Sequence, residues 1–199
     1  RLNIWESEVI RDQAGAAGLS DAIIFNTCAV TAEAEKQARQ AIRKARREHP
    51  DAKIIVTACA AQIAPETWAA MPEVTQVVGN HDKLQAASWT KLAANDSPSL
   101  LVSDVMEVRE TASHMVDSFL EHTRAFLQVQ QGCDHRCTFC IIPYGRGNNR
   151  SAPASDLIDA TRRLVANGCK ELVLTGVDIS SWGSDLPGSP RLGNLVRQI

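Results

Sequence analysis

An alternation of short β-branched runs with longer helical stretches is the feature that most constrains the fold of this chain. Residues 22–26 and 53–57 have the composition of buried parallel strands. Between them, residues 31–48 begin with a threonine suited to an N-cap and continue with an acidic first turn, which predicts a helix. The pattern continues with a short helix, a strand, a helix and an edge strand, at residues 65–71, 75–79, 81–94 and 100–104. This order predicts a parallel α/β sheet with right-handed crossovers.

A second unit of the same type begins near residue 125. Residues 125–130 predict a strand, and a cysteine-rich loop follows it. Residues 154–167 predict an amphipathic helix ended by Gly168, and the next strand and helix are expected at residues 171–175 and 192–196. Two βα units cannot close a barrel. We therefore expect the truncated start of a larger βα domain.

The two units are joined by residues 107–123, which mix charged and small polar side chains without a sustained period. Such a segment is typical of a linker. We place the domain boundary inside it. Residues 1–112 are expected to form a Rossmann-like parallel-sheet domain, and residues 113–199 the truncated second domain.

Composition and charge exclude several classes of protein. Hydrophobic residues make up 44% of the chain, charged residues 22%, and the formal net charge is -2, which together indicate soluble globular domains. No apolar run approaches the roughly 20 residues that cross a bilayer. The pI of about 6.2 lies well below the value of roughly 9 that is typical of nucleic-acid-binding modules, so any RNA contact is local or lies elsewhere. The chain opens with Arg1 and no signal peptide follows, so we expect a fragment of a cytoplasmic, monomeric protein without a membrane anchor.

Six cysteines without an export signal indicate metal ligands or reactive thiols in preference to disulfides. Cys133, Cys137 and Cys140, called the cysteine triad below, lie within eight residues on the loop after the strand at 125–130. Three thiolates at this spacing suit an iron–sulfur cluster with one open iron, or a zinc ion. Structural zinc sites normally take four ligands from two separate knuckles, and this sequence offers a single group of three cysteines. Because His135 could serve as a fourth ligand, zinc remains an alternative.

The C-x3-C-x2-C spacing of the triad, on a loop after the first strand of a βα series, resembles the radical S-adenosylmethionine (SAM) superfamily. In that superfamily three cysteines hold a [4Fe–4S] cluster whose open iron binds SAM. An electron from the cluster cleaves SAM to methionine and a 5′-deoxyadenosyl radical. The resemblance implies that the triad holds such a cluster in the truncated start of a (β/α) partial barrel. It also implies that Phe139 lies near the adenine of SAM and that Thr175 and Gly176 contact this cofactor.

The surrounding residues are similar to those of the methylthiotransferase family within this superfamily. The similar segments are residues 131–132, 141–147 and 174–178 around the triad, and residues 26–31 and 57–60 in the first unit. The resemblance implies a tRNA modification enzyme that methylthiolates C2 of N6-threonylcarbamoyladenosine, 3′ of the anticodon. Sister enzymes that act on isopentenyladenosine in tRNA or on an aspartate of a ribosomal protein are the alternatives.

Two further cysteines, Cys28 and Cys59, stand at the carboxyl ends of the first two predicted strands, where open α/β sheets build their sites. A cysteine there is by itself more often a small buried hydrophobe. In the methylthiotransferase family three cysteines of this domain hold an auxiliary [4Fe–4S] cluster, so the resemblance implies that Cys28 and Cys59 are two of its ligands. The family's first cysteine precedes the residues matched by Arg1-Leu2-Asn3 and is absent here. We expect the chain by itself to assemble the auxiliary cluster poorly and to be inactive.

The resemblance also implies partners for the full-length protein, namely the anticodon arm of tRNA and an electron donor such as a flavodoxin. The non-enzymatic alternative is a zinc- or cluster-stabilised RNA-binding module whose cysteines are structural. Arg146 and Arg150, beside the triad, are candidates for contacting substrate phosphate or the SAM carboxylate, or for bracing the loop. Cys169 is interpreted as a buried structural thiol. The tryptophans are expected in the core, at positions 5, 68, 89 and 182.

Overall fold

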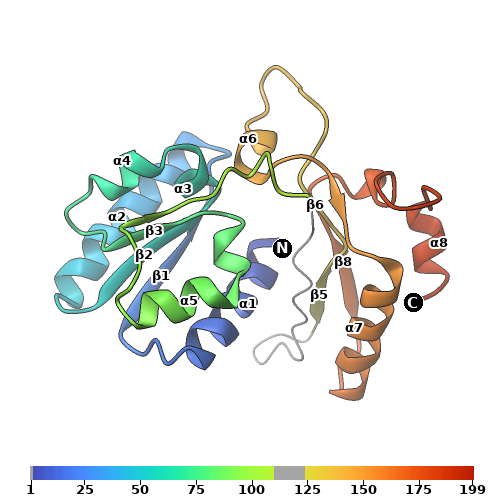
Figure 1. Ribbon diagram of the computed structural model, residues 1–199, viewed down its shortest axis with the longest axis horizontal. Coiled ribbons are helices and arrows are strands. Elements are labelled where there is room, and N and C mark those ends of the chain that lie inside the picture. The colour runs from blue at the N-terminus through green and yellow to red at the C-terminus, as the bar shows by residue number, and fades with distance from the viewer. Residues whose placement is uncertain (1, 110–123) are drawn as a thin grey trace.

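A computed structural model describes residues 2–109 and 124–199 of the chain. These ranges form two α/β units, called the N-terminal and C-terminal units below, which lie side by side (Figure 1). The N-terminal unit is coloured blue to green and the C-terminal unit yellow to red. Most of the predicted linker and the predicted boundary at residues 112 and 113 lie outside the described residues.

A four-stranded sheet forms the centre of the N-terminal unit, with the strand order β1-β2-β3-β4. Its strands are β1 (Ala22–Thr27), β2 (Lys53–Ala58), β3 (Gln76–Val78) and β4 (Leu100–Leu101). All three pairings are parallel, and Ile24 lies opposite Ile55 in the register. The predicted parallel α/β sheet is confirmed. The edge strand expected at residues 100–104 is shorter than predicted, because only its first two residues pair with β3.

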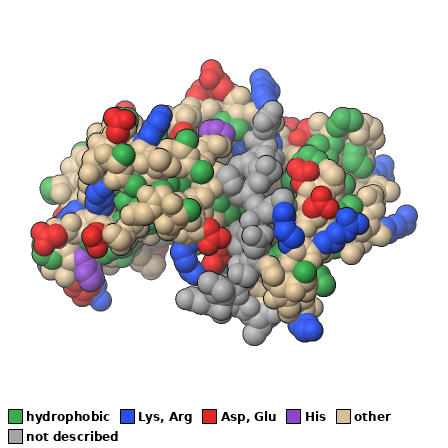
Figure 2. All heavy atoms as spheres, turned by 60° about the horizontal axis from the view of Figure 1, so that its bottom comes forward, with side chains coloured by type: hydrophobic (Ala, Val, Ile, Leu, Met, Phe, Trp, Pro, Cys, Tyr) green, Lys and Arg blue, Asp and Glu red, His purple; other side chains and the backbone are tan. Residues whose placement is uncertain are grey.

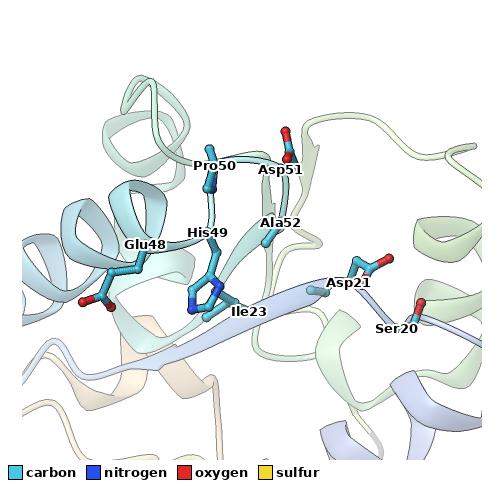
Figure 3. Close-up of a pocket in the computed structure, with 9 residues that line it drawn as sticks. Ser20, Asp21, Ile23, Glu48, His49, Pro50, Asp51 and Ala52 are labelled. Carbon is cyan, nitrogen blue, oxygen red and sulfur yellow. The ribbon is translucent and has the colours of Figure 1, made fainter.

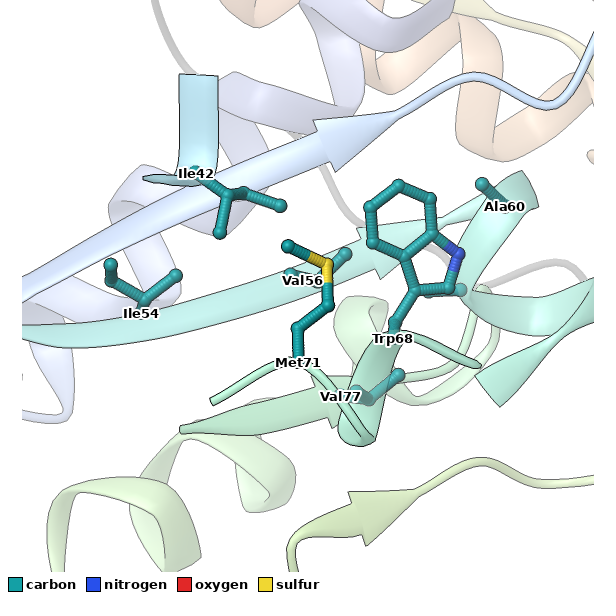
Figure 4. Close-up of a cluster of buried hydrophobic side chains, with 8 residues drawn as sticks. Ile42, Ile54, Val56, Ala60, Trp68, Met71 and Val77 are labelled. Carbon is teal, nitrogen blue, oxygen red and sulfur yellow. The ribbon is translucent and has the colours of Figure 1, made fainter. Parts of the chain in front are cut away.

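Helices cover both faces of this sheet. They are α1 (Leu2–Ala16), α2 (Ala32–Glu48), α3 (Cys59–Ile63), α4 (Pro65–Ala69) and α5 (Ala86–Ala93). Successive side chains of β2 point to opposite faces. Ile54 and Val56 pack with Ile42 of α2 (Figure 4), whereas Ile55 packs with Trp89 of α5 on the other face. The strands are therefore buried on both sides, as their continuous apolar sequence predicts.

The sequence did not predict α1, although its buried residues Trp5, Val9, Ile10 and Ala14 recur at helical spacing. Two glutamates of the same helix are also buried, which weakens the amphipathic pattern. By contrast, α2 begins as predicted, because the Thr31 hydroxyl accepts a hydrogen bond from the backbone of the first turn.

The single helix predicted at residues 81–94 is wrong in its first part. The structure has a 3-10 turn, η1 (Asp82–Leu84), and α5 starts only after Gln85, which is extended. The Asp82 carboxylate accepts hydrogen bonds from the backbone and the hydroxyl of Ser103, at 2.8 and 2.6 Å. These contacts with a distant loop hold η1 in place and interrupt the helix.

The C-terminal unit has the parallel pair β5 (Ala125–Gln128) and β8 (Leu172–Thr175). Its remaining elements are β6 (Gln130–Gln131), α6 (Ile142–Arg146), β7 (Arg150–Ser151), α7 (Ala154–Ala166), η2 (Ile179–Ser181) and α8 (Leu192–Val196). Leu127 and Val129 pack with Leu157 of α7 and with Trp182. The predicted strands and helices of this unit are confirmed, except that the first strand divides into β5 and β6, and β6 pairs with β7 in the antiparallel direction.

The two units contact each other through α3 with α6 and through α1 with β5. Trp5 and Val9 pack with Leu84 and with Phe126 of β5. All four tryptophans are buried, which confirms the prediction that they belong to the core. Among the described residues, no helix has the length and apolar character needed to cross a membrane. Acidic and basic side chains are scattered over both units on the face shown in Figure 2.

Candidate metal centre

The carboxyl edge of the N-terminal sheet carries two cysteines, as the sequence predicted. Cys28 directly follows β1, and Cys59 directly follows β2 as the first residue of α3. Cys28 is half-buried and Cys59 is buried. The residue before Cys59, Ala58, has φ +77° and ψ -156°, a conformation that non-glycine residues rarely adopt. The chain therefore turns sharply where it places the Cys59 thiol.

The surroundings of Cys59 come from both units. The Asn80 amide, which follows β3, donates to the Cys59 sulfur at 3.5 Å and also to the carbonyl of Gly145 in α6. A Cβ on Gly145 would lie 3.2 Å from the Cys59 Cβ, so only a glycine packs there without displacement. α6, the helix that follows the cysteine triad, is thus in contact with Cys59.

The cysteine triad lies on an irregular loop that is anchored at its base. The Cys133 backbone donates to the Gly147 carbonyl at 3.0 Å. Gly132 has φ +73°, and a Cβ on it would lie 1.9 Å from a backbone oxygen, so this close approach requires glycine. Cys133 and Cys140 are half-buried, and Cys137 is exposed. The loop therefore presents its thiols toward solvent.

Two polar side chains stand beside the first thiol of the triad. The Cys133 sulfur lies 3.8 Å from the carboxylate of Asp178, which pairs with His135 at 3.3 Å. Hydrogen bonds from Ser181 and Ser180 hold the pKa of Asp178 below its usual range. Burial raises the pKa of the Cys133 thiol, and the nearby charges of Asp178 and Cys140 add to this effect. His135, the fourth ligand considered for zinc, is directed to a carboxylate.

Gln130, which is fully buried, joins the triad loop to the turn after β8. Its Oε1 accepts from the backbone amides of Val177 and Asp178, at 2.9 and 2.8 Å. Its Nε2 donates to the carbonyl of Gly132 at 2.6 Å and to Asn149 Oδ1 at 2.7 Å. One side chain thus fixes three segments of the site. Sequence reasoning missed this residue, because a glutamine at the end of a strand carries no motif.

The residues predicted to contact SAM occupy different environments. Phe139 is 91% exposed, and its ring stands free on the triad loop. Thr175 is buried at the end of β8. A Cβ on Gly176 would come within 2.8 Å of Gln130 Oε1, so the turn passes close to that side chain.

A buried ionic group connects the two units. Glu6 of α1 binds Lys83 of η1 at 2.8 Å and Arg146 of α6 at 2.7 Å, and the side chains of Glu6 and Lys83 are completely inaccessible. Burial alone raises the pKa of Glu6, but the charges and hydrogen bonds of Arg146 and Lys83 lower it from 4.5 to about 2. Burial lowers the pKa of Lys83. All three residues form one electrostatic unit, called the buried ionic triad below.

The predicted contact of Arg146 with substrate phosphate or SAM is not supported by its position. Arg146 is only 5% exposed and is paired with Glu6. Arg150 is also buried, and it donates to the carbonyls of Asn148 and Arg146 at 2.9 Å. Both arginines therefore brace the loop, which is the second of the roles considered for them.

Two family models match the chain and agree with its two units. Residues 3–79 match the model described as "Uncharacterized protein family UPF0004", and residues 127–186 match the radical SAM superfamily. Over 199 residues the chain is 51% identical to the "Threonylcarbamoyladenosine tRNA methylthiotransferase MtaB" of Rickettsia prowazekii, covering 100% of this chain and 46% of that protein. The chain belongs to the radical-SAM methylthiotransferase family.

Other members of this methylthiotransferase family are more distant. The chain is 29% identical over 216 residues to the "tRNA-2-methylthio-N(6)-dimethylallyladenosine synthase" of Chloroflexus aurantiacus, covering 100% of this chain and 43% of that protein. It is 32% identical over 181 residues to the "Ribosomal protein uS12 methylthiotransferase RimO" of Myxococcus xanthus, covering 89% of this chain and 37% of that protein. The chain spans less than half the length of each of these relatives.

Membership in the radical-SAM methylthiotransferase family implies a [4Fe–4S] cluster and SAM, and the donors on the triad loop fit such a cluster. All three thiols are free, and thiolates are the ligands that iron–sulfur clusters take. Among the described residues, no three His, Cys, Asp or Glu side chains are grouped closely enough to hold a metal ion. The three thiols of the triad therefore share one loop, without a ready-made metal site among the described residues.

Two other features lie apart from the cysteines. An open cavity of about 520 Å³ is lined by the amino end of β1, by the end of α2 and by the turn that leads into β2 (Figure 3). It is at the opposite edge of the sheet from Cys28 and Cys59. Cys169 is half-buried and donates to the Glu171 carbonyl at 3.2 Å, so its prediction as a buried thiol is wrong. The turn between α7 and β8 is too close to the surface to bury it.

Proposed function

We propose that the protein to which this chain belongs methylthiolates C2 of N6-threonylcarbamoyladenosine in tRNA, 3′ of the anticodon. The identity of 51% to a relative named for this substrate supports the proposal, because the relatives named for the two sister reactions are 29% and 32% identical. Enzymes that act on isopentenyladenosine or on a ribosomal-protein aspartate remain the alternatives that the experiment below separates.

One observation carries the chemical part of this proposal. The free thiols of Cys133, Cys137 and Cys140 lie on the one loop that follows β6, and we propose them as the ligands of the radical-SAM cluster. When bound, the cluster and SAM supply the radical that removes an unactivated hydrogen, which no amino-acid side chain can provide.

The chain's own residues hold and orient this cofactor. Phe139 offers an exposed ring for the adenine of SAM, and Thr175 and Gly176 line the strand end that faces the loop. Gln130 keeps the turn after Gly176 at a fixed distance from the triad loop through its hydrogen bonds to both segments.

Cys28 and Cys59 are proposed as two ligands of an auxiliary [4Fe–4S] cluster that holds the sulfur to be transferred. The support is their common position after adjacent parallel strands. For the whole protein we further propose the anticodon arm of tRNA as partner, a flavodoxin-like electron donor, a monomeric state and a cytoplasmic location.

The proposed substrate is tested by nucleoside analysis. The whole protein, as wild type and as Cys137→Ala, is expressed in a bacterial host that lacks its own methylthiotransferases. Digested tRNA is then analysed by liquid chromatography and mass spectrometry. We expect 2-methylthio-N6-threonylcarbamoyladenosine with the wild type and none with the variant. Methylthiolated isopentenyladenosine, or a methylthiolated aspartate in a ribosomal protein, would contradict the proposed substrate.

A further inference from the structure

The buried ionic triad is the most unusual feature outside the cysteine sites. Glu6, Lys83 and Arg146 are brought together from α1, η1 and α6, with ion-pair distances of 2.8 and 2.7 Å. Arg146 also donates to Gln131 Oε1 at 2.9 Å and to Asn3 Oδ1 at 3.2 Å. A side chain of the C-terminal unit is thereby enclosed by polar groups of the N-terminal unit.

The need to hold the two units together does not explain why Glu6, Lys83 and Arg146 are buried between them. Removing charges from water costs free energy, and packed apolar side chains of similar volume often hold an interface as well or better. The contact of Trp5 with Phe126 shows that these units do use apolar packing nearby. Two cations against one carboxylate also leave one positive charge in excess. What a bidentate arginine adds is a fixed direction and distance.

The fixed element is α6, and its neighbour is Cys59. Arg146 is the last residue of α6 and is fixed to Glu6 by two hydrogen bonds. The adjoining Gly145 packs on Cys59 and is held there by Asn80. The Nη1 atom that donates to Glu6 also donates to Gln131, two residues before the first thiol of the cysteine triad. Arg146 therefore links α6, which packs on Cys59, to the segment that leads into the cysteine triad.

We propose that Arg146 is a positioning residue which, held by Glu6, keeps α6 on Cys59 and so fixes the two cysteine sites relative to each other. The importance of this role rests on the proposed function, because a reaction that joins sulfur from one site to carbon activated at another depends on their separation. The contact of α6 with Cys59 itself does not depend on any cofactor.

Protection of the Cys59 thiol tests this proposal on metal-free protein. Iodoacetamide labelling of the native chain is followed cysteine by cysteine by peptide mass spectrometry. We expect Arg146→Met and Glu6→Gln to raise the labelling rate of Cys59 by about ten-fold or more, because α6 opens more often when its anchor is lost. Arg146→Lys, which keeps the charge, should restore part of the protection.

Two controls make the outcome decisive. Arg46→Met removes an arginine that binds the backbone carbonyls of Glu73 and Pro50 within the N-terminal unit, and it should leave Cys59 protected. Urea unfolding of each variant reports general destabilisation, and the half-buried Cys169 reports the reactivity of an accessible thiol. An unchanged rate at Cys59 in Arg146→Met, or a rise that the fall in the free energy of unfolding accounts for in full, would overturn the proposal.

A second readout links the positioning role to the chemistry. In the reconstituted whole enzyme, Arg146→Met should still release 5′-deoxyadenosine from SAM, whereas methylthiolated nucleoside should fall by about ten-fold or more. Equal losses of both products would overturn the positioning role. A wild-type enzyme that cleaves no SAM would instead contradict the proposed function, while the labelling result for Cys59 would stand.

Discussion

The two cysteine sites of this molecule are built in opposite ways. In the N-terminal unit, Cys28 and Cys59 directly follow two paired parallel strands, so a sheet buried on both faces sets their spacing. In the C-terminal unit, the cysteine triad lies on a loop that is anchored at its base and exposed at Cys137. The first pair of cysteines comes from segments 31 residues apart that the sheet brings to one edge. The second group comes from eight consecutive residues of one loop.

The largest effect expected from this contrast concerns iron. After anaerobic reconstitution the chain should bind about four irons, because the triad loop offers three free thiols whereas Cys28 and Cys59 offer two. Cys137→Ala should abolish iron binding, whereas Cys59→Ala should leave it unchanged. Iron and sulfide analysis measures both, with Cys169→Ala as a control. An equal loss of iron from Cys59→Ala would show that the two sites are not independent.

The buried ionic triad between the sites should show itself in acid. The pKa of Glu6 is about 2 in the folded protein and 4.5 as a free group, so its contribution to stability is present above pH 4.5 and is lost as the pH falls toward 2. This contribution is on the order of 3 kcal/mol. Urea unfolding between pH 7 and pH 3 should show a flatter acid dependence for Glu6→Gln than for the wild type.

A matched substitution is available for this acid profile. Glu8 is buried on the same helix, but it pairs with the exposed Arg11 at 3.2 Å and takes no part in the buried ionic triad. Glu8→Gln leaves Glu6, Lys83 and Arg146 in place and should keep the wild-type acid profile. Identical flattening in both variants would contradict a specific role of Glu6.

Backbone strain distinguishes the edge of the sheet, where Cys59 lies, from the loop of the cysteine triad. Ala58 has a conformation that costs a non-glycine residue about 1–3 kcal/mol. Ala58→Gly relieves this strain and loses one buried methyl group, which is worth about 0.8 kcal/mol. The free energy of unfolding should therefore rise by about 1 kcal/mol. Ala60→Gly, the same change in the following helix, should lower it by about 1 kcal/mol or more. An equal fall in the free energy of unfolding in Ala58→Gly and Ala60→Gly would contradict the backbone strain at Ala58.

The smallest expected change in stability is for a substitution on the loop of the cysteine triad. Phe139 is 91% exposed, so Phe139→Ala should alter the free energy of unfolding by less than about 0.5 kcal/mol. If its ring contacts the adenine of SAM, the affinity for SAM should nevertheless fall several-fold. Titration of the reconstituted protein with SAM, followed by the cluster's spectrum, measures this. Unchanged affinity would remove Phe139 from the cofactor site.

The contrast between the sites also explains what could be predicted from the sequence. The strands before Cys28 and Cys59 are short β-branched runs, and the cysteine triad is contiguous, so local pattern was sufficient for both. The surroundings of Cys59 are not local. Asn80 and Gly145 reach it from β3 and from the C-terminal unit, and no spacing in the sequence indicates that contact.

Helix α1 shows the same limit. The sequence reads as a charged start because Glu6 and Glu8 interrupt its apolar face, yet both are buried. Glu6 is stabilised there by Lys83 and Arg146, which lie 77 and 140 residues further along the chain. A buried charge interrupts the hydrophobic periodicity of its helix, and the distant partners that neutralise it cannot be found from local spacing. The helix is therefore not predicted from the sequence pattern.

The most direct test of the account is electron paramagnetic resonance of the reduced, reconstituted protein with and without SAM. We predict a [4Fe–4S] signal that changes on addition of SAM, because three thiolate ligands leave one iron open, and no such signal from Cys137→Ala. A protein that takes up zinc in place of iron, or a cluster whose signal is indifferent to SAM, would contradict it.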